Sequence, residues 1–244
     1  MTRKTKKILI IGSAPDSVNA TKWKNLSFDN IVAINNAWKI RKDWTNCIYP
    51  EDFPINRRPK ASNTQSLHSA DEYVDAQNHF GGFVYAGGTM AFTAGYWALY
   101  KFKPQMICYT GCDMVYKGEK THFYGKGNAD PLRDDKTLKN LKAKSSRLEA
   151  IALLNNCTIV NLSNISESNL SFPKVHINEL DNIVKTQYKK VKKVKINLAF
   201  QKEKKTGYYV PDGKYWKIMD KFDPKKIKII DDLWLCSIQQ KNES

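Results

Sequence analysis

The chain has 244 residues, of which 41% are hydrophobic and 26% are charged, an ordinary composition for a globular protein. Its net charge of +16 favours anionic partners such as nucleotides, nucleic acid or an anionic membrane face, although a lysine-rich surface kept for solubility would give the same balance. The apolar run Ile8–Ile11 is too short for a secretory signal, and no stretch approaches the ~20 apolar residues of a membrane span, so we expect a cytoplasmic protein.

Short β-branched runs alternate with helical patterns in the first two thirds of the chain. This order is typical of an α/β fold with a parallel sheet and helices on both faces. The first runs end at turn residues, and a polar segment between them contains one short helix. The predicted strands are Ile8–Ile11, Ile31–Ile34, Cys47–Tyr49 and Phe83–Tyr85, and the predicted helix is Ala70–Gln77.

Longer elements follow in the middle of the chain. Apolar and small residues at helical spacing predict an amphipathic helix over Thr89–Phe102. A central strand is expected at Gln105–Tyr109, and the longest predicted helix spans Thr137–Asn155. The strand Cys157–Leu162 completes the alternating pattern.

The composition changes from about Leu180. Residues 184–244 carry 16 lysines against 7 acidic residues. Alternation of lysine and valine over Val191–Ile196 predicts a strand, and a Pro211-Asp212-Gly213 turn between aromatic residues predicts a hairpin. Ile227–Ile230 and Leu233–Ile238 could add another strand pair, so we expect a small, basic, β-rich C-terminal appendage.

The five cysteines are scattered and contain no CxxC pair. Three of them lie in apolar strand-like runs, which suits reduced and buried thiols. A zinc site would need clustered cysteine and histidine ligands, so no metal site is expected.

Polar and glycine-containing segments follow the predicted strands, where ligands bind in open α/β sheets. Gly12-Ser13-Ala14-Pro15 follows the first strand and can hold a phosphate on its backbone N–H groups, with Pro15 able to start a helix. It is not a GxGxxG fingerprint, because Pro15 falls where that turn needs freedom. Asn35 and Asn36 offer amide groups for a base edge or sugar, or alternatively an Asx turn that caps a helix.

The segment Gly87–Tyr124 concentrates further candidates. Gly87 and Gly88 precede Thr89 at a predicted helix start, which permits either close approach of a ligand or a tight turn. Asp113 follows the central strand, where a carboxylate often binds ribose hydroxyls or a metal. No second aspartate neighbours it, which argues against a DxD-type metal site.

His122 is the candidate general base among the four histidines. It does not lie on an apolar face, so we do not expect it to be packed in the core. An imidazole with a pKa near 6.5 can deprotonate a hydroxyl. Tyr116 and Tyr124 could donate hydrogen bonds to a departing phosphate. The other histidines are expected at the surface or in turns: His68, His79 and His176.

The order of these motifs resembles the small bacterial sialyltransferases of glycosyltransferase family 42. The motifs are GSAPD after the first strand, Asn35 after the second, then GGTMAFTAGYWAL, TGCDMVY and THFYGKG, spread over roughly residues 7–165. The resemblance implies a Rossmann-like domain of a modified GT-A type that binds a CMP-sugar and requires no metal or other cofactor. It departs from the family at Ser13-Ala14, at Met90-Ala91 and in the C-terminal part, which leaves the sugar open.

The resemblance also implies residue roles. His122 would be the general base, and Tyr116 would contact the phosphate. Together with the strand-end residues, the predicted donor site comprises Gly12, Ser13, Pro15, Asn35, Asn36, Gly88, Thr89, Asp113 and Tyr124. We therefore divide the chain into a Rossmann-like catalytic domain, residues 1–179, and a basic, aromatic-containing appendage, residues 180–244.

The leading hypothesis is a glycosyltransferase that moves a sialic-acid-like sugar from a CMP-activated donor to a hydroxyl of a glycan or glycolipid by direct displacement. In one alternative the acceptor is a hydroxymethylated base in DNA, tracked by the basic C-terminal region. A second alternative is ATP-dependent pyrophosphate transfer, as in archaeal-type hydroxymethylpterin pyrophosphokinase-like proteins, which share a loop-helix-strand pattern. A third is a nucleotide-binding protein without catalysis. Peripheral contact with the inner membrane face and homo-oligomer formation stay open.

Overall fold

The computed structural model describes residues 6–23, 28–127, 134–183 and 189–240. Its centre is a parallel sheet of six strands in the order β4-β3-β2-β1-β5-β6. This confirms the predicted α/β class with a Rossmann-like parallel sheet. The strands are β1 (Lys7–Ile11), β2 (Asn30–Ile34), β3 (Asn46–Ile48), β4 (Ser66–His68), β5 (Met106–Thr110) and β6 (Thr158–Asn161).

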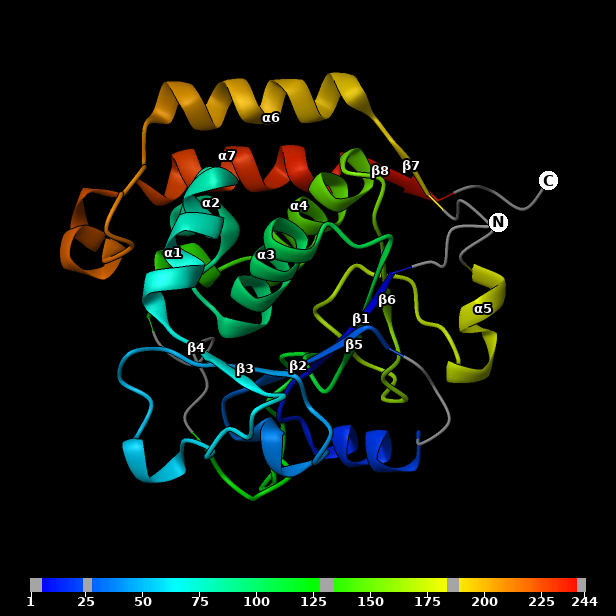
Figure 1. Cartoon of the computed structure of the whole chain (residues 1–244). Coiled ribbons are helices and arrows are strands. Elements are labelled where there is room, and N and C mark those ends of the chain that lie inside the picture. Colours follow the sequence, from blue (N-terminus) through cyan, green and yellow to red (C-terminus); the bar gives the residue numbers. More distant parts are fainter. Residues whose placement is uncertain (1–5, 24–27, 128–133, 184–188, 241–244) are drawn as a thin grey trace.

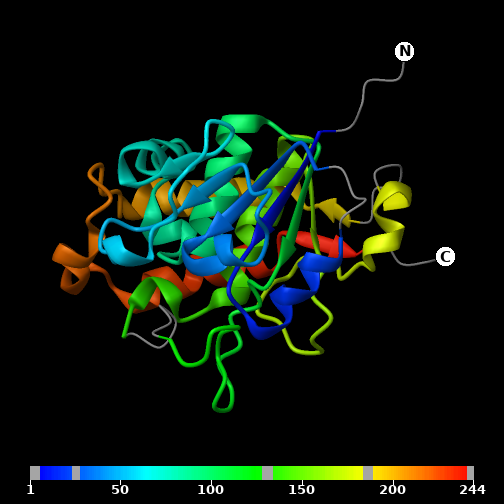
Figure 2. The same ribbon diagram turned by 60° about the horizontal axis from the view of Figure 1, so that its bottom comes forward.

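Helices cover both faces of the sheet, as predicted. Because side chains alternate along a strand, Ile8 and Ile10 of β1 enter one core while Leu9 and Ile11 enter the other. The first face packs against helices that stack above the sheet in Figure 1. These are α1 (Ala70–His79), α2 (Phe83–Ala86), α3 (Met90–Phe102) and α4 (Leu141–Leu154). The opposite face packs against shorter helices, seen from their side in Figure 2: η1 (Pro15–Lys22), η2 (Asn35–Lys39) and α5 (Leu180–Ile183).

The strand order reverses between β1 and β5, which makes the ends of these two strands the topological switch point. The loops that follow them touch each other: Gly12 N–H donates to Thr110 O at 2.8 Å, and Ala14 N–H donates to Gly111 O at 3.0 Å. A Cβ added at Gly12 would overlap the backbone of Gly111. The glycine is therefore needed for contact between the two loops.

The C-terminal part is mainly helical, so the prediction of a β-rich appendage is wrong. Its helices are α6 (Lys193–Thr206), η7 (Tyr215–Lys221) and α7 (Pro224–Leu235). In α6 the buried residues Ile196, Ala199 and Glu203 follow a helical period, which the alternation of lysine and valine at its start concealed. Strand pairing in the described part of this region is limited to β7 (Lys189–Val191) and β8 (Ile238–Gln240).

Helices α6 and α7 stack on the helical layer of the sheet domain (Figure 1). Two buried ion pairs join the layers: Lys144 Nζ lies 2.7 Å from Asp231 Oδ1, and Arg147 Nε lies 2.8 Å from Glu203 Oε1. Arg147 also donates to the hydroxyl of Tyr96. Residues far apart in the chain thus share one interior, while the boundary between residues 179 and 180 stays a prediction.

Three further elements differ from their predictions. The apolar run at Phe83 is the short helix α2, because Gly82 and Gly87 on either side have φ near +90° and break any extension. Strand β4 lies in the polar segment where no strand was predicted. The longest predicted helix is divided into η5 (Lys136–Leu138) and α4. The remaining short helices are η3 (Ile55–Arg57) and η6 (Ile177–Glu179), and none of the helices in the described ranges is long and apolar enough to cross a bilayer.

Candidate active site

A cavity of about 320 Å³ opens at the carboxyl ends of the strands, at the switch point. The loops after β1, β2, β3 and β5 and the start of α3 all contribute to its wall. It brings together most of the residues predicted for the donor and the reaction. These are Gly12, Ser13, Asn35, Asn36, Thr89, Tyr116, His122 and Tyr124.

Three predicted site residues lie outside the cavity wall: Pro15, Gly88 and Asp113. Asp113 is completely buried, its Oδ1 accepts a hydrogen bond from Asn161 Nδ2 at 2.8 Å, and it does not line the cavity. Its side chain therefore ties the loop after β5 to the end of β6. Pro15 occupies the first turn of η1, where its fixed φ starts that helix, and it too lies outside the cavity wall.

Gly88 also lies outside this cavity, for a reason that the sequence did not reveal. A Cβ added at Gly88 would overlap the hydroxyl of Tyr215, which comes from the C-terminal segment. Gly88 N–H donates to Thr137 Oγ1 at 3.3 Å. The double glycine therefore serves the packing of two distant segments around the start of α3.

The N-terminus of α3 faces the cavity. Thr89 is the N-cap residue and is 6% exposed, and its side chain makes no capping hydrogen bond. Met90 and Ala91, the first two helical residues, line the cavity. The first backbone N–H groups of a helix have no partner within the helix, and the helix dipole places partial positive charge there. This end of α3 can hold an anion such as a phosphate.

Asn35 and Asn36 line the cavity, and each has a buried side-chain oxygen without a partner in the described part of the chain. The Oδ1 atoms of both are buried and have no hydrogen-bond partner within the described residues. Asn36 is 4% exposed, and Asn35 has a φ of +51°, a left-handed conformation that asparagine tolerates. A buried acceptor without a partner costs free energy, so a side-chain rotation that turns either oxygen into the cavity would let it accept from a ligand's N–H or O–H groups.

His122 is 8% exposed, so the prediction that it would not be packed is wrong. Its ring packs against those of Tyr116 and Tyr124, with centroid distances of 6.0 Å and 5.0 Å. This burial disfavours the charged imidazolium and lowers the pKa of His122 below its usual 6.5. The side chain is therefore neutral near pH 7, as a general base must be.

Hydrogen bonds orient the His122 ring. Its Nδ1 lies 2.9 Å from Thr121 Oγ1, which also accepts from Gly127 N–H at 3.4 Å. When Nδ1 carries the proton and donates it to Thr121, Nε2 has the lone pair for proton transfer. Phe123 N–H donates to Ser13 O at 2.9 Å, so this segment is tied to the loop after β1 although it projects beyond the sheet (Figure 2, green).

The sequence interpretation missed the cationic residue of this wall. Arg57, in η3 after β3, lines the cavity and is exposed. The neighbouring Arg58 is engaged elsewhere, because it donates to Phe53 O and stacks on the ring of Tyr49. The rule that ligands bind beyond strand ends points to this loop, but nothing in the sequence tells which of the two arginines is turned towards the cavity.

The predicted positions of the remaining histidines are confirmed in part. His79 and His176 are exposed, as predicted, whereas His68 is buried and bonds to Glu72 and Asn46. Burial lowers the pKa of His68 below its usual value. His68 is a structural residue that joins β4 to β3 and to α1.

The cysteines are free thiols, and burial raises the pKa of Cys47 to about 12 and that of Cys112, in the cavity wall, well above its usual value. A neutral thiol is a poor nucleophile, so we assign no nucleophilic role to Cys112. Among the residues that the structure describes, no three histidine, cysteine, aspartate or glutamate side chains gather in a way that could hold a metal ion.

Comparison of the chain with protein-family models, with curated proteins and with solved structures found no match. The chemistry of the site therefore rests on its own geometry: a helix N-terminus for an anion, two acceptors for ligand donors and a neutral imidazole packed against two tyrosines.

Proposed function

We propose that this chain is a glycosyltransferase that uses a CMP-activated acidic sugar. The observation that carries the proposal is that one cavity is lined by the start of α3, by Asn35 and Asn36, whose buried side-chain oxygens are unpaired among the described residues, and by the buried His122. A sugar linked to a nucleoside monophosphate has a group that matches each of these three features. The groups are a phosphate, hydrogen-bond donors on the base and ribose, and an anomeric carbon that reacts with a nucleophile activated by a general base.

The donor would lie along the wall of the cavity. Its phosphate would bind the first backbone N–H groups of α3, near Met90 and Ala91. The amide oxygens of Asn35 and Asn36 would accept from the amino group of cytosine or from ribose hydroxyls. Arg57 would pair with the carboxylate of the sugar.

The reaction would be a direct displacement at the anomeric carbon. Nε2 of His122 takes the proton of the acceptor hydroxyl, and the oxygen forms a bond to the anomeric carbon. The bond from that carbon to the phosphate oxygen breaks, and CMP leaves with the bonding electron pair. The N-terminus of α3 and the hydroxyl of Tyr116 stabilise the negative charge on the leaving group, so the step needs no metal ion.

Substitution of the base tests the proposal. We expect His122→Gln to lower kcat for release of CMP from CMP-N-acetylneuraminate by roughly 10²–10⁴-fold, with water or a glycoside as acceptor. The Kd for CMP should stay unchanged, because His122 acts on the acceptor. His79→Gln, at an exposed histidine outside the cavity, is the matched control. Unchanged turnover in His122→Gln would remove the base from the proposal.

A further inference from the structure

A second cavity, of about 390 Å³, adjoins the first. Pro50, Asp52 and Met90 line both, so the two share a wall at the loop after β3 and the start of α3. The far side of the second cavity is formed by residues 212–216 of the C-terminal segment. The two cavities are therefore neighbours on either side of this wall.

Aromatic rings form one wall of the second cavity. Phe83 stacks on Tyr215 at a centroid distance of 6.0 Å and an interplanar angle of 20°, and Tyr73 meets Phe83 edge-on at 6.3 Å. Trp216 stands against Tyr215 and is 57% exposed. The hydroxyl of Tyr215 donates to Asp135 Oδ2 at 2.8 Å, which fixes its ring. Trp216 is therefore the exposed ring of this wall, and the buried rings of Tyr73, Phe83 and Tyr215 support it.

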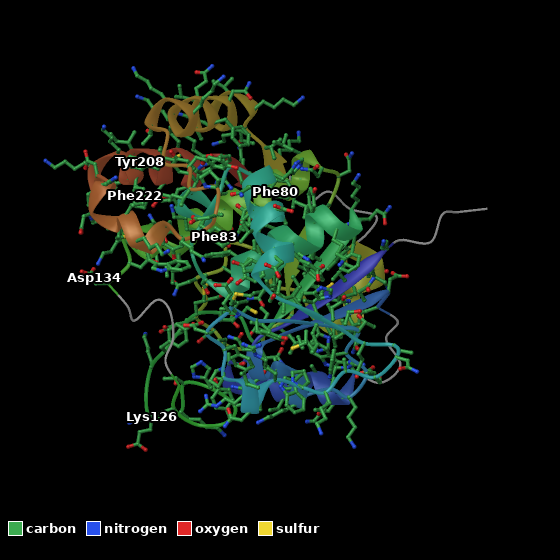
Figure 3. All side chains as sticks on the ribbon, turned by 60° about the vertical axis from the view of Figure 1, so that its left-hand side comes forward. Phe80, Phe83, Lys126, Asp134, Tyr208 and Phe222 are labelled. Atoms are coloured by element: carbon green, nitrogen blue, oxygen red, sulfur yellow. The ribbon has the colours of Figure 1, made fainter. Side chains whose placement is uncertain are left out.

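The C-terminal loop is held firmly against this wall. Asn78 Nδ2 donates to Pro211 O at 2.7 Å, and Asp212 Oδ1 accepts from Lys214 N–H at 2.9 Å. Gly213 has a φ of +72°, and an added Cβ would lie 3.0 Å from the ring of Phe83. Figure 3 shows Phe83 beside the segment that carries Tyr208 and Phe222. The cavity is thus built by fixed contacts between α1, α2 and the C-terminal segment.

The charge of the second cavity is opposite to that of the molecule. Its charged lining residues are Glu51, Asp52, Asp212 and Lys214, three carboxylates against one ammonium, in a chain of net charge +16. Burial, and then the nearby Glu51 and Asp52, raise the pKa of Tyr73. Carboxylates accept hydrogen bonds from hydroxyl groups but repel phosphates. This chemistry disfavours a nucleic-acid backbone and suits a ligand that is not anionic and carries several hydrogen-bond donors, such as hydroxyls.

We propose that the second cavity binds the acceptor as a neutral saccharide ring. Its apolar face would lie on Trp216 and its hydroxyls would donate to Glu51 and Asp212, with one hydroxyl directed past Asp52 and Met90 to the donor. That the bound saccharide is the acceptor of the reaction rests on the proposed function. The choice of ligand rests on the lining of the cavity alone.

Direct binding of simple sugars tests this inference. Saturation-transfer NMR would be recorded with the methyl pyranosides of glucose, galactose and N-acetylglucosamine, and with glucose 6-phosphate and glucuronic acid as anionic counterparts. We expect at least one neutral pyranoside to bind and its anionic counterparts to bind about tenfold more weakly or not at all. Trp216→Ala should weaken the neutral sugar about tenfold, and Glu51→Gln should weaken it by a smaller factor.

The control is Tyr209→Ala, because Tyr209 is also exposed and also in the C-terminal segment but lines neither cavity. Absence of binding by every neutral pyranoside, or equal loss in the Trp216 and Tyr209 variants, would overturn the inference. Calorimetry with CMP on the same samples separates the two proposals. If the wild type binds CMP but none of the neutral sugars, only the proposed acceptor site is contradicted. If the wild type does not bind CMP, the proposed donor site is contradicted.

Discussion

His122 is buried against two tyrosine rings, and this burial sets its protonation state. The sequence identified the residue by its polar neighbours but not its environment, because Tyr116 and Tyr124 reach the ring only when the loop folds back. The same limit applies to Gly88, which looked like a ligand contact and accommodates Tyr215. A residue's type and spacing can be read from the chain, whereas the identity of its partners depends on the fold.

The lowered pKa of His122 predicts the pH dependence of the reaction. The neutral base prevails at neutral pH, so kcat should be level there and fall as the pH drops through a pKa below 6.5. Tyr124→Ala should expose the ring and move this pKa towards 6.5. Tyr100→Ala, at a tyrosine that is equally 43% exposed, should not move it. A kcat–pH profile measures the shift, and a pKa at or above 6.5 in the wild type contradicts the burial argument.

The same shift affects stability. The unfolded imidazole takes up a proton at a higher pH than the buried one, so the unfolded state binds more protons between the two pKa values. The contribution of His122 to the free energy of unfolding is therefore fully present above about pH 6.5 and is lost as the pH falls through the lowered pKa.

Among the elements, α4 shows most clearly what a sequence pattern does not predict. Its apolar residues predicted a helix correctly, but Lys144 and Arg147, in the same helix, are buried as well. Their charges are neutralised by Asp231 and Glu203, which lie 87 and 56 residues further along the chain. Such pairing across distant segments leaves no local signal. The error in the C-terminal region has the same origin, because helices α6 and α7 form on the surface that α4 provides.

Adjacent aspartates in α7 provide a matched test of this packing. Asp231 pairs with Lys144 at side-chain exposures of 4% and 1%, whereas Asp232 pairs with Lys228 at exposures of 51% and 73%. Asp231→Asn should lower the free energy of unfolding by about 3–5 kcal/mol, because it leaves a buried lysine without its partner. Asp232→Asn should change it by less than about 1 kcal/mol. Urea unfolding measures both, and equal small effects would contradict the packing of α7 on α4.

At the scale of the molecule, strands β1, β2, β3, β5 and β6 and their order along the chain were predictable, because each rests on a local apolar run. The sequence could also place the cavity, since the strand ends of a parallel sheet meet at one edge. It could not reveal the second cavity, which needs residues 50–52, α1, α2 and the C-terminal segment together. Nor could net charge alone reveal that this cavity is acidic while the outer face of α6 is basic.

From the exposed apolar and lysine side chains on the outer face of α6, we predict that this face contacts anionic membranes. Val194 is 79% exposed and lies beside the exposed Lys195, Leu198, Lys202 and Lys205. Changing the three lysines to glutamate should weaken binding to phosphatidylglycerol vesicles by about 1 kcal/mol or more for each residue, and added salt should weaken the wild type similarly. Vesicle sedimentation measures this.

The control for this face carries the same three changes on exposed lysines elsewhere: Lys42, Lys60 and Lys120. An equal loss in both triple variants would mean that net charge, and not α6, governs binding. Salt-dependent binding of duplex DNA by the α6 face would favour the nucleic-acid alternative instead.

The central claim is that the cavity at the switch point binds a cytidine monophosphate. Calorimetric titration with CMP, UDP, GDP and ATP tests it most directly, with Asn36→Leu as the site variant because the Oδ1 of Asn36 is buried without a partner within the described residues. We expect CMP to bind, to be preferred over the other nucleotides, and to lose about tenfold in affinity in Asn36→Leu while the free protein keeps its stability. Binding of ATP without binding of CMP would contradict the account.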